Sequence, residues 1–396
     1  FKGTCGFYHK AVLKIHLSSF VHVVLHGDME FFTLFYTEYE KSKELPEAYR
    51  YAAAYEYAFS HFTPAITPGE LIVGSRNFSP APEIVKAWKE TYHDIAMARQ
   101  VQHGQDSHMA IDYELLLSQG VLGVIAKIDG YLENCEEEKV PFYSCCKQCL
   151  QGIIRYSENY AAAALALAEK ETDGQTKEEL LRIGKICKKV PAHPAESFYE
   201  AVQAVHFISH CLSLNPYRLC SQQFQLGHPD RYLLPYYEKD IQSGALTKEF
   251  AQLLLDCLGI QINMRVPSGL SSGYMVGGRD EKGNLVANEL TEMCMQVIDD
   301  IQLVYPAVGL CCTPEMPETY LEQACRLLQK GYSHPAIFND DVIARGLMAY
   351  GVPEEQAHNY IHSTCVEITP VAASNVWVAS PYHNMPQFLL DIMDRE

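Results

Sequence analysis

Two side chains near the end of the chain have residue types and a spacing that could do chemistry together. Cys365 and Glu367 lie in the run Thr364-Cys365-Val366-Glu367-Ile368-Thr369, in which every second residue is β-branched. This two-residue period predicts extended backbone, which places the two side chains on one side, roughly 7 Å apart. A thiol and a carboxylate so placed could combine sulfur chemistry with proton transfer.

A second copy of the pattern shows how little it establishes alone. Cys135 precedes Glu136 and Glu137 in an acidic run that we interpret as solvated surface. A free cysteine is more often a small buried hydrophobe than a reactive group. The pair at Cys365 and Glu367 therefore needs support from the rest of the chain.

The other cysteine patterns favour structure over chemistry. Cys146 and Cys149 have a CxxC spacing, but they lie in a predicted helix and have no matching second pair. Cys311 and Cys312 end an apolar run, which favours core packing. We expect no metal site from these residues.

Two polar segments are more ambiguous. Residues 103–108 are the densest polar stretch and precede a predicted helix, so they could carry a site or could cap the helix, with Asp112 as N-cap. Residues 277–283 contain three glycines but lack the Lys-Ser/Thr of a phosphate-binding loop. That second segment predicts a hairpin turn.

The elements that must position these residues are mostly helices. Thr247 is a predicted N-cap, residues 71–74 predict a short strand or a turn-ending run, and residues 1–45 have poor periodicity. Without repeats or low-complexity linkers, this pattern predicts an α/β or α+β fold dominated by helix. Helical patterns cover 46–62, 113–130, 143–169, 177–187, 195–213, 248–262, 287–298, 317–330, 340–350 and 354–361.

Composition limits the class of protein. A chain of 396 residues suggests two or three domains or one large barrel, and a net charge of -18 argues against nucleic-acid or anionic-membrane partners. The 14 cysteines lack the regular spacing of a secreted scaffold, which favours reduced thiols in a cytoplasmic protein and is compatible with life without oxygen. No apolar run reaches the roughly 18 residues of a membrane span, and residues 13–25 lack a cleavage site.

The scattered segments agree with one family. In order along the chain, they resemble the glycyl radical enzymes of the pyruvate formate-lyase type. The matching segments are 68–74, His108, 112–114, 120–123, 190–192, 198–203, 227–237, 277–278, 288–290, 335–340 and 365–367.

The resemblance implies an α/β fold: part of a ten-stranded α/β barrel surrounded by many helices. It implies that Cys365 forms a thiyl radical after a glycine on a second loop loses a hydrogen to a radical S-adenosylmethionine activating enzyme. The thiyl radical would then take hydrogen from a small-molecule substrate. The resemblance also implies a homodimer with no bound cofactor and no metal.

Glu367 indicates the branch. The formate-lyase branch carries two adjacent cysteines at this point, whereas Thr364 and Val366 flank Cys365 here. The Cys-x-Glu pattern resembles the dehydratase, carbon–nitrogen lyase, carbon–sulfur lyase and arylacetate decarboxylase branches, in which the glutamate is a general base. The expected reaction is therefore radical cleavage of a C–O, C–N or C–S bond, with formate C-acetyltransferase activity as an alternative.

The chain departs from the family pattern in two ways. Thr364 stands where these branches usually have glycine before the cysteine, and no segment resembles the glycyl sequence Arg-Val-x-Gly-Tyr. We therefore expect residues 1–396 to be one truncated domain, poorly matched over 1–45, without the C-terminal half-barrel and the glycine radical domain. A catalytically inactive split or degenerate member is the second hypothesis.

The resemblance also suggests substrate contacts. His108 and Asp106 match a region that often lines the pocket, and Tyr382 follows the cysteine loop. His334 and Asn339 are interpreted as structural. A third hypothesis, a cysteine hydrolase with Cys365 as nucleophile, would need His362 or His383 within hydrogen-bond reach.

Overall fold

The computed structural model describes residues 29–67, 69–77, 79–92, 106–107, 109–214, 224–265, 272–362, 367–373, 377–378, 389–390 and 392–393. Of residues 106, 107, 265, 377 and 378 only the backbone is described.

The described residues form a mixed α/β fold in which helices predominate, as predicted. The helices are α2 (Met29–Lys41), α3 (Glu47–His61), α4 (Pro82–Ala87), η1 (Trp88–Tyr92), α6 (Tyr113–Leu132), η2 (Glu137–Lys139), α7 (Val140–Lys170), α8 (Gly174–Lys189), α9 (Phe198–Ser213), α10 (Pro229–Tyr232), α11 (Leu234–Ser243), α12 (Lys248–Arg265), α13 (Glu289–Ile301), α14 (Glu318–Gln329), α15 (Asp340–Ala349) and α16 (Glu354–Ala357). The strands are β1 (Asp106–Ser107), β2 (Gly273–Gly277), β3 (Ala307–Cys312), β4 (Ala336–Asn339), β5 (Tyr360–His362), β6 (Ile368–Pro370) and β7 (Trp377–Val378).

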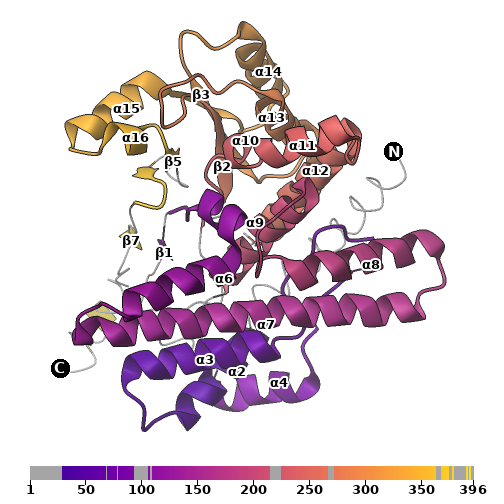
Figure 1. Ribbon diagram of the computed structural model, residues 1–396, viewed down its shortest axis with the longest axis vertical. Coiled ribbons are helices and arrows are strands. Elements are labelled where there is room, and N and C mark those ends of the chain that lie inside the picture. Colours follow the sequence, from indigo (N-terminus) through magenta and orange to yellow (C-terminus); the bar gives the residue numbers. More distant parts are fainter. Residues whose placement is uncertain are drawn as a thin grey trace.

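A helical layer built on α7 forms one part of the molecule (Figure 1). The 31-residue helix α7 packs against α3 on one side and α8 on another, while α2 packs on α3. The small buried residues Ala161 and Ala164 permit this close approach. Buried aromatic side chains, among them Phe31 and Tyr156, fill the space between the helices.

Helix α6 links this layer to the rest of the molecule. The Asp112 side chain caps it by accepting a hydrogen bond from the Leu115 amide at 2.8 Å, as predicted. Gly120 has a φ of 66° because the chain bends there to bond Pro191, and a Cβ at this position would meet Ala192 at 2.5 Å. The helix has the length and composition of a membrane span, but it packs against α7 and α9, so we interpret it as a core helix.

A parallel sheet forms the other part (Figure 1). Strands β2, β3 and β4 pair in that order, and α13 and α14 connect them. Backbone hydrogen bonds extend the sheet beyond β2, through residues 224–227 to Met109, with all segments running in one direction. Side chains of Tyr274, Val276 and Leu310 lie on the face buried in the main core, which α13 covers.

Most helix predictions are confirmed. Those over 46–62, 113–130, 143–169, 177–187, 195–213, 248–262, 287–298, 317–330 and 340–350 correspond to α3, α6, α7, α8, α9, α12, α13, α14 and α15. Thr247 accepts a hydrogen bond from the Phe250 amide, as expected for an N-cap. Asn339, which we interpreted only as structural, caps α15. Residues 277–283 turn back on themselves, since an antiparallel bridge joins Arg279 to Leu285.

One helix prediction is wrong. The helix predicted over 354–361 ends at Ala357, because Tyr360 and Ile361 pair with the strand at 368–370. Of the two alternatives for residues 71–74, the strand does not form, because Gln203 bonds both the amide and the carbonyl of Val73. These residues instead follow a turn, in which the Glu70 amide donates to the Thr67 carbonyl at 3.1 Å. Helix α2 was not predicted, because it lies in the region of poor periodicity.

Candidate active site

The predicted cysteine loop lies at the tip of a short hairpin. Strand β5 pairs antiparallel with β6, in the register Tyr360 to Pro370 and His362 to Ile368. Residues 363–366, which include Cys365, connect the strands and lie outside the described residues. Glu367 is half-buried and directly precedes β6. The extended backbone predicted for this region is confirmed at Ile368 and Thr369.

The hairpin packs on the face of the sheet that α13 does not cover. Tyr360 and Ile361 share a small second core with Met275, Cys311 and Ala110. Alternation along the paired strands places small residues on this face, which leaves room for the hairpin. The small residues in register there are Gly273, Gly277, Ala307, Gly309 and Ala336.

The direction of the hairpin follows from its contacts. Tyr360 donates a hydrogen bond to Cys311 Sγ at 3.4 Å, near the carboxyl end of β3. His362 lies further back along the same strand, since a Cβ at Gly309 would be 2.9 Å from its ring. Its ring also stacks on Phe338, with centroids 4.9 Å apart. Strand β5 therefore enters at the carboxyl ends of the sheet strands and runs toward their amino ends.

Polar and charged side chains surround residues 358–360, the start of the hairpin, which we call the hairpin base. Asp340 is fully buried, and burial raises the pKa of its carboxyl despite the nearby Arg231 and His358. Burial also raises the pKa of Cys311 above its usual range, so this thiol stays protonated. Cys311 therefore packs as an uncharged group, in agreement with the sequence interpretation.

An open cleft of about 690 Å³ lies beside this base, at the carboxyl ends of the strands. His228 and Arg231 line it on one side. Acidic side chains form much of the rest: Asp112, Glu114, Asp280, Glu281 and Glu355. Burial and the charges of Glu281 and Asp112 raise the pKa of Glu114. Glu367 is not among the described residues that line the cleft, so we do not assign the chemistry to it.

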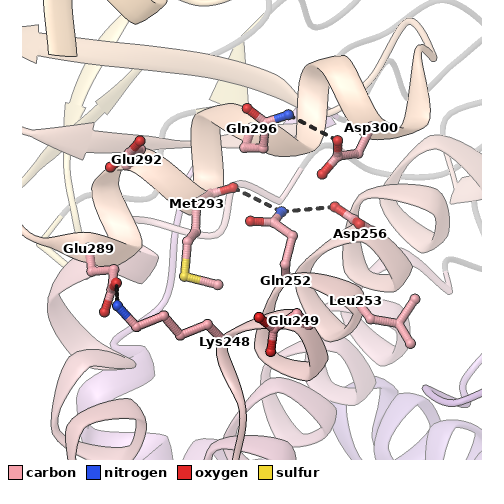
Figure 2. Close-up of a pocket in the computed structure, with 10 residues that line it drawn as sticks. All are labelled: Lys248, Glu249, Gln252, Leu253, Asp256, Glu289, Glu292, Met293, Gln296 and Asp300. Atoms are coloured by element: carbon pink, nitrogen blue, oxygen red, sulfur yellow. Dashed lines mark hydrogen bonds and ion pairs between the residues drawn. The ribbon is translucent and has the colours of Figure 1, made fainter. Parts of the chain in front are cut away.

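A second cavity, of about 610 Å³, lies between α12 and α13 (Figure 2). Gln252 joins its two walls by donating to Asp256 at 2.9 Å and to the Met293 carbonyl at 3.1 Å. Lys248 forms an ion pair with Glu289 across its edge. These helices pack on the opposite face of the sheet from the hairpin, so this cavity is not the candidate active site.

The predicted substrate contacts lie mostly outside the described residues. This holds for His108 and Tyr382, and only the backbone of Asp106 is described, paired with Val378 in the β1–β7 ladder. Ala110, a few residues after Asp106, contacts the hairpin, since the Ala372 amide donates to the Ala110 carbonyl at 2.9 Å. The roles of these residues stay predictions.

The sequence interpretation missed the residues that hold the hairpin. His228 and Arg231 contact its backbone, yet segment 227–237 was used only as a match to the family. Among the described residues no group of acidic, histidine and cysteine side chains could hold a metal. Burial raises the pKa of Cys149 to about 12, which disfavours a redox role for the CxxC spacing.

Comparisons with known proteins agree with these features. A family model described as pyruvate formate lyase-like matches residues 81–395. Trans-4-hydroxy-L-proline dehydratase of Clostridioides difficile is 29% identical over 281 residues, which are 68% of this chain and 34% of the relative. Isethionate sulfite-lyase of Oleidesulfovibrio alaskensis is 30% identical over 276 residues, 65% of this chain and 33% of the relative.

A solved structure gives the same result. The structure concerns 1,2-propanediol dehydration in Roseburia inulinivorans and superposes with a TM-score of 0.77 at 28% identity. The match covers 87% of this chain and 49% of that one. The chain thus spans about a third of the length of these curated relatives and about half of the solved structure.

Proposed function

This chain belongs to the pyruvate formate lyase-like family, and on that premise we propose that it carries the thiol side of a glycyl radical dehydratase or lyase. The reaction is cleavage of a C–O, C–N or C–S bond in a small polar substrate. The observation that carries the proposal is the hairpin of Cys365 and Glu367, packed on the small-residue face of a parallel sheet.

Cys365 would exchange hydrogen with the substrate. A glycyl radical would supply the unpaired electron, and the S–H hydrogen of Cys365 would pass to that glycine. The thiyl radical then takes hydrogen from a substrate carbon, so that an S–H bond forms as a C–H bond breaks. The radical performs the difficult step, while the protein contributes position and exclusion of water.

Glu367 would act as the general base. Once the substrate carbon holds the radical, Glu367 takes the proton of its hydroxyl group, and the leaving group departs from the neighbouring carbon with its electron pair. Cys365 then returns its hydrogen to the product radical. The half-buried position of Glu367, directly before β6, supports this role.

We propose that the substrate lies between Cys365 and strand β1. His108, Asp106 and Tyr382 are the proposed substrate contacts. Relatives named as a hydroxyproline dehydratase and an isethionate sulfite-lyase indicate a small, polar substrate. They differ in the bond they break, so the class of leaving group is left open between them.

The proposed reaction requires more strands and a glycyl loop in addition to the segments described above. In the described part of the chain no strand pairs with the far edge of β4, and Ile337 on that strand is 46% exposed. Unpaired strand edges are usually covered. We propose that further strands, from the remainder of a longer polypeptide, complete a ten-stranded barrel there and bring the glycyl loop. A radical S-adenosylmethionine activating enzyme, a homodimer and a cytoplasmic location complete the proposal.

The inactive split member is the second candidate. Thr364, at the position before the cysteine where the active branches usually have glycine, favours it. Formate C-acetyltransferase activity is disfavoured, because no second cysteine adjoins Cys365.

The decisive experiment uses the complete gene product, activated without oxygen and examined by electron paramagnetic resonance. We expect a glycyl doublet in the wild type and in Cys365→Ala, with turnover abolished in the variant. Glu367→Gln should keep the doublet and lose turnover by about 100-fold or more, as for a missing general base.

Cys135→Ala is the matched control, because Cys135 begins the other Cys-x-Glu pattern and lies half-exposed beyond α6. It should keep both the doublet and full turnover. Turnover in Cys365→Ala would contradict the mechanism, and a wild type that never develops the doublet would favour the inactive member.

A further inference from the structure

The hairpin that carries Cys365 is too short to hold its own position. Each of its strands has three residues, and isolated two-stranded hairpins are at most marginally stable in water. A slip of one residue would turn every side chain to the opposite face. The location of Cys365 and Glu367 therefore depends on contacts at the hairpin base.

Arg231 makes the first of these contacts. Its Nη1 donates to the His358 carbonyl at 2.8 Å, and its Nη2 donates to the Gly277 carbonyl at 2.9 Å. His358 leads into β5, and Gly277 ends β2. A single guanidinium thus joins the hairpin to the sheet, with the two-donor geometry that arginine has and lysine lacks.

His228 makes the second contact, three residues earlier. Its Nε2 donates to the Tyr360 carbonyl at 2.6 Å, on the first residue of β5. His228 is buried, and burial together with the Arg231 charge lowers the pKa of its ring well below the usual range. The imidazole is therefore neutral, with its hydrogen on Nε2, and acts as a fixed donor.

Asp230 lies between these two residues in the sequence and fixes the segment 228–231 that carries both of them. Its carboxylate accepts from the Gly277 amide at 2.7 Å and from the Thr291 hydroxyl at 2.8 Å. Burial raises the pKa of Asp230 to about 6, against the opposing effect of Arg231. The charge of Arg231 thus faces two buried carboxyl groups, those of Asp230 and Asp340.

We propose that His228 and Arg231 are positioning residues that set the depth and register of the Cys365 hairpin. The second arm of the hairpin is attached through a backbone bond from Ala372 to Ala110 and through the packing of Ile368 and Val371 on the second core. The effect on turnover rests on the function proposed above, whereas the effect on the hairpin does not.

Hydrogen–deuterium exchange in the complete gene product, before activation, tests the positioning role directly. In Arg231→Lys and His228→Leu, amides of residues 358–372 should exchange about ten-fold faster, as when a strong hydrogen bond is lost. Peptides from α7 and α8 should be unchanged. His228→Gln keeps a donor near the Nε2 position and should restore slow exchange.

Arg279→Met is the matched control. Arg279 lies at the same end of the sheet, but its guanidinium pairs with Glu315 and Asp341 rather than with the hairpin. It should leave exchange of 358–372 unchanged. Equal exchange in the wild type and both test variants would overturn the proposal, as would faster exchange spread over the whole protein.

Turnover of the activated protein supplies the second readout. Arg231→Lys and His228→Leu should keep the glycyl doublet and lower kcat about ten-fold or more, with KM within about two-fold, while His228→Gln recovers kcat. Unchanged kcat despite faster hairpin exchange would overturn the link to chemistry. If the wild type shows no doublet, the proposed function fails, and the exchange experiment alone decides the positioning role.

Discussion

The two faces of the β2–β3–β4 sheet belong to the same strands but are built from different residues. The face covered by α13 presents Tyr274, Val276 and Leu310 to the main core. The face covered by the hairpin presents several glycines and alanines beside Met275 and Cys311, and polar side chains at its edge hold the hairpin. Large apolar residues on one face provide stability, whereas small residues on the other provide room for a positioned loop.

This comparison predicts that similar changes on the two faces affect different properties. Substitutions on the hairpin face should impair turnover more than stability. Substitutions on the helix-covered face should impair stability and leave the turnover of each folded molecule intact. Gly309→Val and Leu310→Ala test this contrast directly, and Asp256→Asn then tests how burial affects stability on helix α12.

The largest effect is expected at Gly309. A Cβ there would lie 2.9 Å from the His362 ring and 3.0 Å from Phe338, so Gly309→Val must displace the hairpin. Overpacking costs about 1–3 kcal/mol of stability, but we expect turnover of the activated protein to fall at least about 100-fold, since small misplacements of reacting groups cost that much. Wild-type turnover in a folded Gly309→Val would contradict the contrast.

Leu310, the next residue, faces the opposite way and is fully buried. Leu310→Ala should lower the free energy of unfolding by about 2–5 kcal/mol, through lost burial and a remaining cavity. Denaturant titration measures that loss. Turnover per folded molecule should stay within about three-fold of wild type, and a loss like that of Gly309→Val would remove the distinction between the faces.

The smallest effect is expected at Asp256, on helix α12, beside the cavity between α12 and α13. Burial raises the pKa of Asp256 to about 7, although Gln252 donates to its carboxylate (Figure 2). The folded protein therefore holds a proton that the unfolded chain releases near its ordinary pKa of 3.8. Stability from this group is present below pH 3.8 and is lost as the pH rises to about 7.

Asp256→Asn cannot ionise and should avoid that loss. Between pH 5 and pH 8, the free energy of unfolding of the wild type should fall by roughly 2–3 kcal/mol more than that of the variant. Glu249→Gln, an exposed carboxyl beside the same cavity, is the control and should follow the wild type. Parallel pH profiles for the wild type and Asp256→Asn would show that this carboxyl is not buried as described.

The helices could be predicted from the sequence because their signals are local. Apolar spacing and caps such as Asp112 and Thr247 lie next to the elements they define. The strands of the sheet could not be predicted in this way. Gly273–Gly277 is extended because it pairs with a strand more than thirty residues later. Strand β5 was missed for the same reason: its partner lies beyond the loop.

The site divides in the same way. Cys365 and Glu367 could be selected because their spacing is local and the family resemblance supports them. His228 and Arg231 could not, because nothing near them in the sequence indicates a contact with Tyr360 or His358. Only the folded chain brings these residues together.

The separation of those contacts along the chain has a consequence for folding. His228 meets Tyr360 across 132 residues, and Arg231 meets His358 across 127. Closing so long a loop costs chain entropy that must be met before the contacts form, so such contacts slow folding. Strands β2 and β3 must already be assembled to receive the hairpin. We therefore expect the cysteine loop to be among the last parts of the nascent protein to reach its place, after the scaffold that protects it.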